Sequence, residues 1–127
     1  IRDRTVTGVQ SVALPICFEI VRNDRKLKIW KNLVTANFVG ASLEFKHCEM
    51  KDIKHNDFRK KNPLGKIPVL ETPHGCIYES NAIMRYLTRE HKSTTLYGET
   101  TFEAGLVDQW IDFCNNELEP AAVVLLF

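Results

Sequence analysis

The chain has 127 residues, of which 44% are hydrophobic, and it carries 17 lysines and arginines against 16 aspartates and glutamates. The apolar content excludes a disordered chain, and the few, aperiodic glycines and prolines exclude collagen-like or low-complexity architecture. The length fits one ordinary domain, or a small domain with the beginning of another. The longest apolar stretch, residues 121–127, is far shorter than the ~20 residues of a membrane-spanning helix.

Charge is divided unevenly along the chain. Residues 1–92 hold all 17 basic residues and 10 acidic ones, whereas residues 93–127 hold six acidic residues and no basic ones. Such a step indicates two structural units. The basic residues are scattered and have no accompanying array of aromatic side chains on which bases could stack, so we expect no direct nucleic-acid binding.

The four cysteines do not form a metal-binding motif. They are spaced 31, 28 and 38 residues apart, with no Cys-x-x-Cys pair and no histidine at zinc-ligand spacing: Cys17, Cys48, Cys76 and Cys114. We therefore expect no metal site. Their even number permits two disulfides, but a chain with this much core does not need them, and reduced thiols in a cytoplasmic protein are the better interpretation.

The chain begins with a predicted strand and helix. Residues 13–21 form a mostly continuous apolar run, which is typical of a strand buried on both faces of a sheet. From Asp24 the period changes, and Gly40 marks the end of an amphipathic helix. Asn32 falls among the polar residues of this helix. Its apolar residues recur every three or four positions: Leu27, Trp30, Val34 and Phe38.

A second strand and a polar loop follow the helix. Residues 42–47 alternate between polar and apolar side chains, with Phe45 and His47 on the apolar face, which predicts a strand. Residues 50–61 are polar and basic, and we interpret them as a loop with one short helix around residues 57–61.

The middle of the chain predicts a hairpin and another helix. Asn62-Pro-Leu-Gly is a turn signal, and residues 67–70 form a short strand. The turn Thr72-Pro-His-Gly then leads to a strand over residues 76–78. Ser80 and Asn81 can cap a helix that runs to about residue 91.

A polar linker, residues 92–98, separates these elements from a long helix. Thr100-Thr-Phe-Glu is a capping-box pattern at its start, and Pro120 is expected to end or kink it. We expect the apolar face of this helix to pack against the preceding unit or against further helices, and to be exposed where residues 1–92 do not cover it. The face contains Leu106, Trp110 and either Ile111 or Cys114.

Two motifs in this order resemble the thioredoxin-like domain of glutathione transferases. They are Asn62-Pro-Leu-Gly-Lys-Ile-Pro-Val-Leu-Glu-Thr and, after the hairpin turn, Glu79-Ser-Asn-Ala-Ile. The resemblance extends from about Ala13 to Phe127. It implies an α/β fold, with a thioredoxin-like N-terminal domain over residues 13–92. Residues 93–127 would be a linker and the first helix of a truncated all-α glutathione-transferase C-terminal domain.

The resemblance also implies a glutathione site. In the family, a cis-proline turns the preceding backbone toward the cysteinyl unit of glutathione, and these two positions correspond to Ile67 and Pro68. Glu79 and Ser80 correspond to the pair that holds the γ-glutamyl end. Ser80 would also stand at a helix N-terminus, where backbone donors favour a carboxylate.

Two lysines, Lys54 and Lys66, are weaker candidates for holding the glycyl carboxylate of glutathione. A purely structural interpretation stays open for all these residues. Pro68 then shapes the fold, Ser80 caps a helix, and the lysines are solvated.

The sequence departs from the family where the thiol of glutathione is activated. Glutathione transferases use a Tyr, Ser or Cys shortly after the first strand, but residues 18–34 contain none of these and no Thr. Arg22, Asn23 and Arg25 occupy the region. An amide or a guanidinium could still stabilise a thiolate, so conjugation is weakened rather than excluded, and we assign no catalytic residue.

Other reactive or aromatic side chains are interpreted as core residues. Cys17 lies inside the first predicted strand. His47 and Cys48 are adjacent on a strand and would face opposite ways, so they do not form an activated pair. The same interpretation applies to aromatic and thiol side chains of the last helix, Trp110, Phe113 and Cys114.

Within the superfamily, the likeness is greatest to the gamma-subunit family of translation elongation factor 1, through residues 62–89, 96–98 and 109–113. This resemblance implies a cytoplasmic scaffold that anchors the guanine-exchange subunit of the elongation factor 1 complex, with homo-oligomerisation left open. The alternative is a theta- or phi-like enzyme that conjugates glutathione to small electrophiles. The missing hydroxyl group after the first strand favours the scaffold, although fold alone does not decide.

Overall fold

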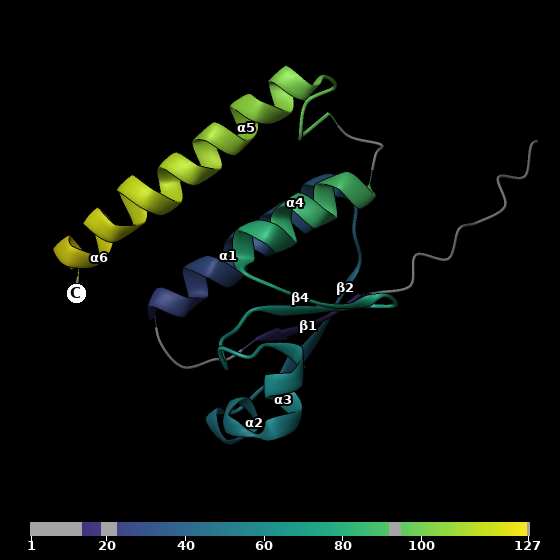
Figure 1. The fold of residues 1–127 in the computed structure, drawn as a ribbon, viewed down its shortest axis with the longest axis vertical. Coiled ribbons are helices and arrows are strands. Elements are labelled where there is room, and N and C mark those ends of the chain that lie inside the picture. The colour runs from purple at the N-terminus through teal and green to yellow at the C-terminus, as the bar shows by residue number, and fades with distance from the viewer. Residues whose placement is uncertain (1–13, 19–22, 92–94, 127) are drawn as a thin grey trace, which may run out of the picture.

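The computed structural model describes residues 14–18, 23–91 and 95–126. Strands and helices alternate over most of this length, and a helical segment completes it (Figure 1). The elements are β1 (Leu14–Phe18), α1 (Asn23–Val39), β2 (Leu43–His47), α2 (Met50–Lys54), α3 (Asn56–Lys61), β3 (Val69–Thr72), β4 (Gly75–Tyr78), α4 (Ser80–Glu90), α5 (Thr101–Phe113), η1 (Cys114–Leu118) and α6 (Glu119–Leu126).

The four strands form one mixed sheet in the order β2-β1-β3-β4. β1 and β2 are parallel, because α1 crosses over between them, whereas β3 runs antiparallel to β1. β3 and β4 are the two strands of the predicted hairpin, with Leu70 opposite Ile77. The strand predicted over residues 67–70 begins at Val69 instead.

Helices cover both faces of the sheet. α1 and α4 lie together on one face, and α2 and α3 lie on the other (Figure 1). Val69 and Leu70 are neighbours on β3 that point to opposite faces, and both are fully buried. Val69 packs in a cluster with Ile53 and other apolar residues, while Leu70 packs with residues of α1 and α4. The predicted thioredoxin-like α/β fold is confirmed.

The predicted apolar face of α1 is wrong. Trp30 and Phe38 are 59% and 69% exposed, and the side chain of Leu27 lies outside the described residues. The buried face instead includes Asn32 and Thr35, whose side chains donate to helix carbonyls at 3.1 and 2.8 Å. Because these donor groups are bonded within the helix itself, burying them costs less than burying unbonded ones.

The segment predicted as a loop over residues 50–61 contains two short helices, α2 and α3. Polar side chains cap them. Glu49 and Asp52 form a capping box at the start of α2, and the Nδ1 atom of His55 accepts a hydrogen bond from the backbone N–H of Asp57 at 3.3 Å. The hydrophilic residues that suggested a loop therefore include helix caps.

The last helix begins as predicted but does not end at Pro120. Thr100 and Glu103 form the predicted capping box at the start of α5. After α5 the chain winds through η1, a π-helical turn, and continues as α6 with Pro120 in its first turn. The wider turn accommodates the missing N–H of proline and the clash of its ring with the preceding turn.

α5 leaves its apolar face uncovered by the described residues. Leu106 is 41% exposed, Trp110 is 61% exposed, and Cys114 is exposed as well, whereas Ile111 is half-buried. The ring of Trp110 contacts that of Phe113 edge to face, with 5.6 Å between the centroids. Among the described residues, no helix is both long and apolar enough to cross a membrane.

Candidate functional site

The sheet brings four of the six predicted site residues to one place. Val69 is opposite Tyr78 in the hairpin, so Ile67-Pro68 directly before β3 and Glu79-Ser80 directly after β4 lie at the same end. The carboxyl end of β1 meets this end too, because Cys17 is opposite Val69 in an antiparallel pair. The peptide bond between Ile67 and Pro68 is cis, as predicted, and both residues are buried.

The loop that leads into Ile67 is held by a residue that the sequence analysis did not identify as important. Asn62 is almost completely buried, and its Nδ2 atom donates to the carbonyl of Lys66 at 2.6 Å. Its Oδ1 atom accepts a hydrogen bond from the backbone N–H of Leu64 at 3.0 Å. Its backbone carbonyl accepts one from the backbone N–H of Gly65 at 2.9 Å. The Asn-Pro-Leu-Gly turn signal was the clue, since asparagine side chains often bond to the backbone two residues later.

On the other side of the site, α4 begins without a side-chain cap. The N-cap residue is Glu79 rather than the expected Ser80, and Glu79 makes no capping hydrogen bond. Ser80 is the first residue of the helix and is buried. Donors of an uncapped first turn suit a carboxylate ligand, because the helix N-terminus carries partial positive charge.

Glu79 has an unusual backbone conformation, with φ of 70° and ψ of 115°. A side chain rarely adopts positive φ, and such residues persist where the surrounding structure holds them. Glu79 is exposed and directly precedes Ser80, at the end of the hairpin where Pro68 also lies. This position can accept a hydrogen bond from an ammonium group.

The two predicted lysines are exposed near the same loop. Lys54 is the last residue of α2, and Lys66 directly follows Gly65. A Cβ atom added at Gly65 would lie 3.4 Å from the carbonyl oxygen of Ile53, the residue before Lys54. The backbone therefore brings the two lysine-bearing segments close together. Neither lysine has an ion-pair partner among the described residues, so both ammonium groups can meet an anion.

The side chains predicted to replace the thiol-activating residue lie outside the described residues. Arg22 lies outside the described residues, and the side chains of Asn23, Arg25 and Cys17 do too. Their roles stay predictions from the sequence.

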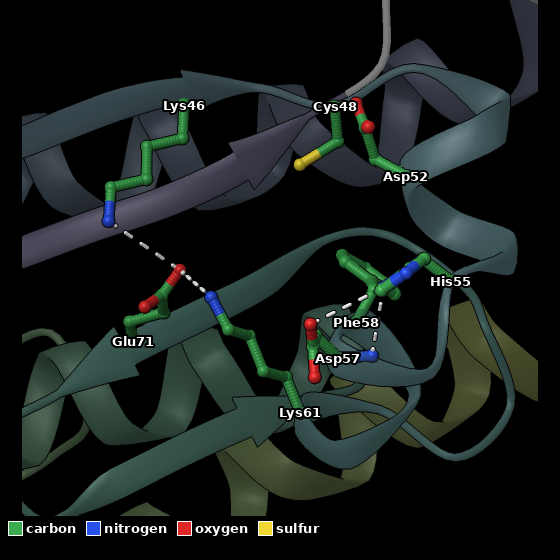
Figure 2. Close-up of a pocket in the computed structure, with 8 residues that line it drawn as sticks. All are labelled: Lys46, Cys48, Asp52, His55, Asp57, Phe58, Lys61 and Glu71. Carbon is green, nitrogen blue, oxygen red and sulfur yellow. Dashed lines mark hydrogen bonds and ion pairs between the residues drawn. The ribbon is translucent and has the colours of Figure 1, made fainter.

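A pocket of about 320 Å³ lies elsewhere, between the sheet and the helices α2 and α3 (Figure 2). None of the six predicted residues lines it. Two of its lysines pair with the same carboxylate: the Nζ atoms of Lys46 and Lys61 lie 3.7 and 2.8 Å from Oε1 of Glu71. Cys48 also lines the pocket as a buried free thiol in the core, while the side chain of His47 is not described. Among the described residues, no group of side chains could hold a metal ion.

Comparison with known proteins agrees with this geometry. A model of the glutathione S-transferase N-terminal domain matches residues 17–89. Elongation factor 1-gamma 1 of rice is 40% identical over 98 residues, covering 76% of this chain and 23% of the relative. A probable elongation factor 1-gamma 2 of Arabidopsis thaliana is 41% identical over 91 residues, covering 70% and 22%. The chain thus spans less than a quarter of the length of these curated relatives.

Solved structures show the same fold. Poplar glutathione transferase F1 matches 91% of this chain and 56% of its own, with a TM-score of 0.78 and 19% identity. A theta-class glutathione S-transferase from Xanthomonas axonopodis pv. citri, with glutathione bound, matches 83% of this chain and 49% of its own, with a TM-score of 0.68 and 26% identity. The chain belongs to the glutathione S-transferase N-terminal domain family.

Proposed function

We propose that the chain is the glutathione-transferase-like module of an elongation factor 1-gamma subunit. In this role it is a cytoplasmic scaffold that anchors the guanine-exchange subunit of the elongation factor 1 complex. The observation that carries the proposal is the 40% identity to elongation factor 1-gamma over 76% of the chain. Identity to the solved transferases compared above is only 19% and 26%, and that likeness concerns the fold.

The module consists of a thioredoxin-like domain over residues 13–92 and, over residues 93–127, a linker with the first helix of an all-α domain. Three observations support this division. Charge changes sign at the boundary, α5 starts with its own capping box, and none of its residues is buried. A helix whose apolar face is uncovered is typical of a bundle member that packs against other helices.

The hairpin end with the cis-proline is a glutathione site in this proposal. Ile67 and Pro68 offer backbone to the cysteinyl unit. Glu79, Ser80 and the uncapped start of α4 receive the amino and carboxylate groups of the γ-glutamyl end. Lys54 and Lys66 face the glycyl carboxylate.

Conjugation by this site is weak or absent in the proposal. A thiol of pKa ~8.5 is only a few per cent thiolate at neutral pH. Residues 18–34 contain no Ser, Thr, Tyr or Cys whose side chain could raise the thiolate fraction. An active glutathione transferase is the alternative, in which Arg22, Asn23 or Arg25 stabilises the thiolate. The solved relatives that carry the transferase name keep this alternative in view.

The scaffold is tested by purifying the protein from its native source and identifying its stoichiometric partners. The expected partner is the guanine-exchange subunit of the elongation factor. Purification as a homo-oligomer without that subunit would contradict the scaffold.

The glutathione site is tested separately, by calorimetry with glutathione and by conjugation of an aryl halide. Binding without turnover is expected. Robust turnover that is lost in Arg22→Ala, Asn23→Ala or Arg25→Ala, but kept in the control Arg59→Ala, would contradict the scaffold function and support an active glutathione transferase. Absence of binding would contradict the proposed glutathione site, but it would not affect the proposed scaffold function.

A further inference from the structure

The position of α5 depends on polar contacts more than on burial. None of its residues is buried, and its aromatic side chains are exposed. Val107 and Ile111 are only half-buried. Apolar burial, the usual means of fixing one helix on another, is therefore small at this junction.

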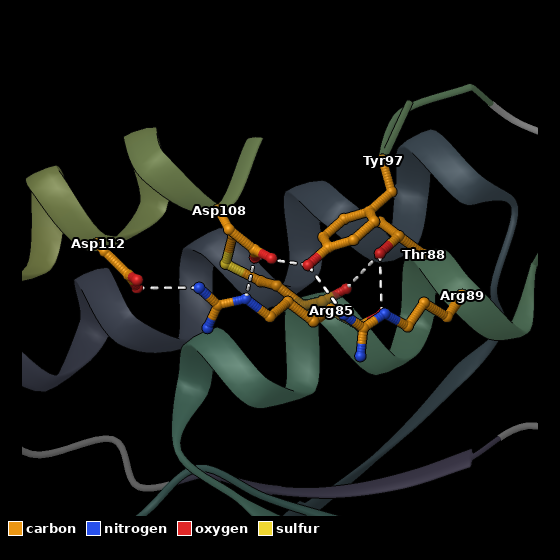
Figure 3. Close-up of polar contacts among 7 residues, drawn as sticks. Arg85, Thr88, Arg89, Tyr97, Asp108 and Asp112 are labelled. Atoms are coloured by element: carbon orange, nitrogen blue, oxygen red, sulfur yellow. Dashed lines mark hydrogen bonds and ion pairs between the residues drawn. The ribbon is translucent and has the colours of Figure 1, made fainter. Parts of the chain in front are cut away.

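Arg85 links α4 directly to α5 (Figure 3). A separate ion pair reaches the continuation of this helical segment, because the Nζ atom of Lys31 on α1 donates to Oε1 of Glu119 at the start of α6 at 2.9 Å. The Nε atom of Arg85 donates to Oδ1 of Asp108 at 2.5 Å, and its Nη2 atom donates to Oδ1 of Asp112 at 2.9 Å. The two aspartates are four residues apart on α5, so one guanidinium bridges a full helical turn. Two contacts on one helix fix its rotation as well as its distance.

Tyr97 ties the linker to the same pair of helices (Figure 3). Its hydroxyl donates to Oδ1 of Asp108 at 2.5 Å and accepts from Nη2 of Arg89 at 3.0 Å. The guanidinium of Arg89 also lies 4.9 Å from the centre of the tyrosine ring. Asp108 is thus the acceptor that α4 and the linker share.

Gly98 allows the linker to come this close. It has φ of 79°, and a Cβ atom at this position would clash with the Cβ atom of Glu103 and with the backbone of α5. The Leu-Tyr-Gly stretch of residues 96–98 therefore has a definite physical role: Tyr97 makes the contact, and Gly98 makes room for it.

We propose that Arg85, Tyr97 and Asp108 form an electrostatic clasp that holds α5 in one orientation on α4 and releases it when the clasp is screened or broken. The side chains are partly open to solvent: the exposed fraction is 23% for Arg85, 36% for Asp108 and 62% for Asp112. Salt weakens such pairs, because the screening length falls from about 10 Å at 0.1 M to about 3 Å at 1 M. The clasp thus makes α5, with its exposed aromatic face, a hinged element. This inference does not depend on the proposed function.

The test measures the distance between α5 and the sheet with spin labels on two native exposed thiols, Cys76 on β4 and Cys114 on η1. The full chain is used with Cys17 and Cys48 replaced by alanine. At 50 mM NaCl we expect one narrow distance distribution, which broadens at least twofold at 1 M NaCl. In Arg85→Leu, which removes both contacts to α5, the distribution should be broad at both salt concentrations. In Tyr97→Phe, which removes only the hydroxyl contacts, it should be broader than in the parent at 50 mM NaCl.

The salt response distinguishes a clasp from a merely structural role. Arg59→Leu removes an exposed arginine of α3 and should behave as the parent at both concentrations. A parent distribution that is narrow at 1 M NaCl, or already broad at 50 mM, would overturn the proposal. So would a narrow distribution in Arg85→Leu, or one in Tyr97→Phe that matches the parent at 50 mM NaCl.

Folding failure of a variant does not obscure the result. Circular dichroism checks each variant, and Tyr97→Phe removes only one hydroxyl. Hydrogen exchange on the unlabelled natural chain gives a second measurement. Amides of residues 95–104 should exchange at least tenfold faster at 1 M NaCl than at 50 mM after correction for intrinsic rates, while amides of β3 should not. Equal responses of both segments would contradict a hinge.

Discussion

Asn32 donates a hydrogen bond to the carbonyl of Lys28 at 3.1 Å, four residues earlier on α1, while its own Oδ1 atom is buried and has no partner among the described residues. The side chain is completely enclosed between α1 and its neighbours. A buried carbonyl oxygen without a partner costs about 1–3 kcal/mol. This residue is therefore a site where an apolar side chain of similar branching should fit better.

We predict that Asn32→Leu raises the free energy of unfolding by about 1 kcal/mol, because it removes the unpaired oxygen. The Lys28 carbonyl keeps its backbone partner within the helix. Urea denaturation measures the change. Thr35→Val is the matched control: its hydroxyl already donates to the carbonyl of Lys31, so we expect a change within about 0.5 kcal/mol. Destabilisation by Asn32→Leu would show that the oxygen has a partner such as an enclosed water.

The same helix shows where prediction from sequence reaches its limit. Its existence and end were predictable from local signals, the spacing of apolar residues and Gly40, which has φ of 70°. The buried face was not, because it is decided by a partner helix that is distant in sequence. Trp30 lies outside although it is apolar, and Asn32 lies inside because its amide is bonded to its own helix.

The candidate site divides in the same way. Ile67, Pro68, Glu79 and Ser80 were named from motifs, and the strand register brings them together. Asn62 was missed, because its two backbone contacts depend on how the loop folds back on itself. The π-helical turn before Pro120 was not foreseen either, since proline alone predicts an end or a kink, not a change of winding.

Gly98 and Gly105 should respond in opposite ways to the same substitution. Gly98→Ala adds a Cβ atom at positive φ against α5, and we expect it to destabilise the protein by about 1–3 kcal/mol. Gly105 is within α5, and a Cβ atom there would meet no atom of the described residues within 4 Å, so Gly105→Ala should stabilise the protein by about 0.5–1 kcal/mol. Thermal denaturation of both variants measures the difference. Equal effects would contradict the close approach of the linker to α5.

Asp108 should make stability depend on pH with a definite sign. The Tyr97 hydroxyl first, and then the guanidinium of Arg85, hold the pKa of Asp108 below its ordinary value, and the charge of Arg89 acts in the same direction. A lowered folded-state pKa stabilises the protein above the unfolded-state pKa, and this contribution is lost as the pH falls through the folded-state pKa.

The measurement compares the parent with Asp108→Asn in urea between pH 7 and pH 3. The difference in the free energy of unfolding should be constant above about pH 5 and should shrink at lower pH. Tyr97→Phe is the control background, because removing the hydroxyl removes the largest cause of the shift, and the pH dependence of the difference should be smaller there. A difference that grows as the pH falls would have the wrong sign for this arrangement.

Two substitutions of Glu79 should distinguish the effect of its backbone strain on stability from the effect of its carboxylate on glutathione binding. Its φ of 70° is costly for any side chain but not for glycine, so Glu79→Gly should be more stable than Glu79→Ala by about 1 kcal/mol. Both variants lack the carboxylate that would receive the ammonium group of glutathione, and we expect both to bind it at least tenfold more weakly than the parent. Denaturation measures the difference in stability, and calorimetry measures the affinity for glutathione.

Glu71→Gln is the control. It alters a carboxylate in the separate pocket of Figure 2 and should leave glutathione affinity unchanged. If Glu79→Gly and Glu79→Ala bind glutathione as tightly as the parent does, the Glu79 carboxylate does not contact the ligand.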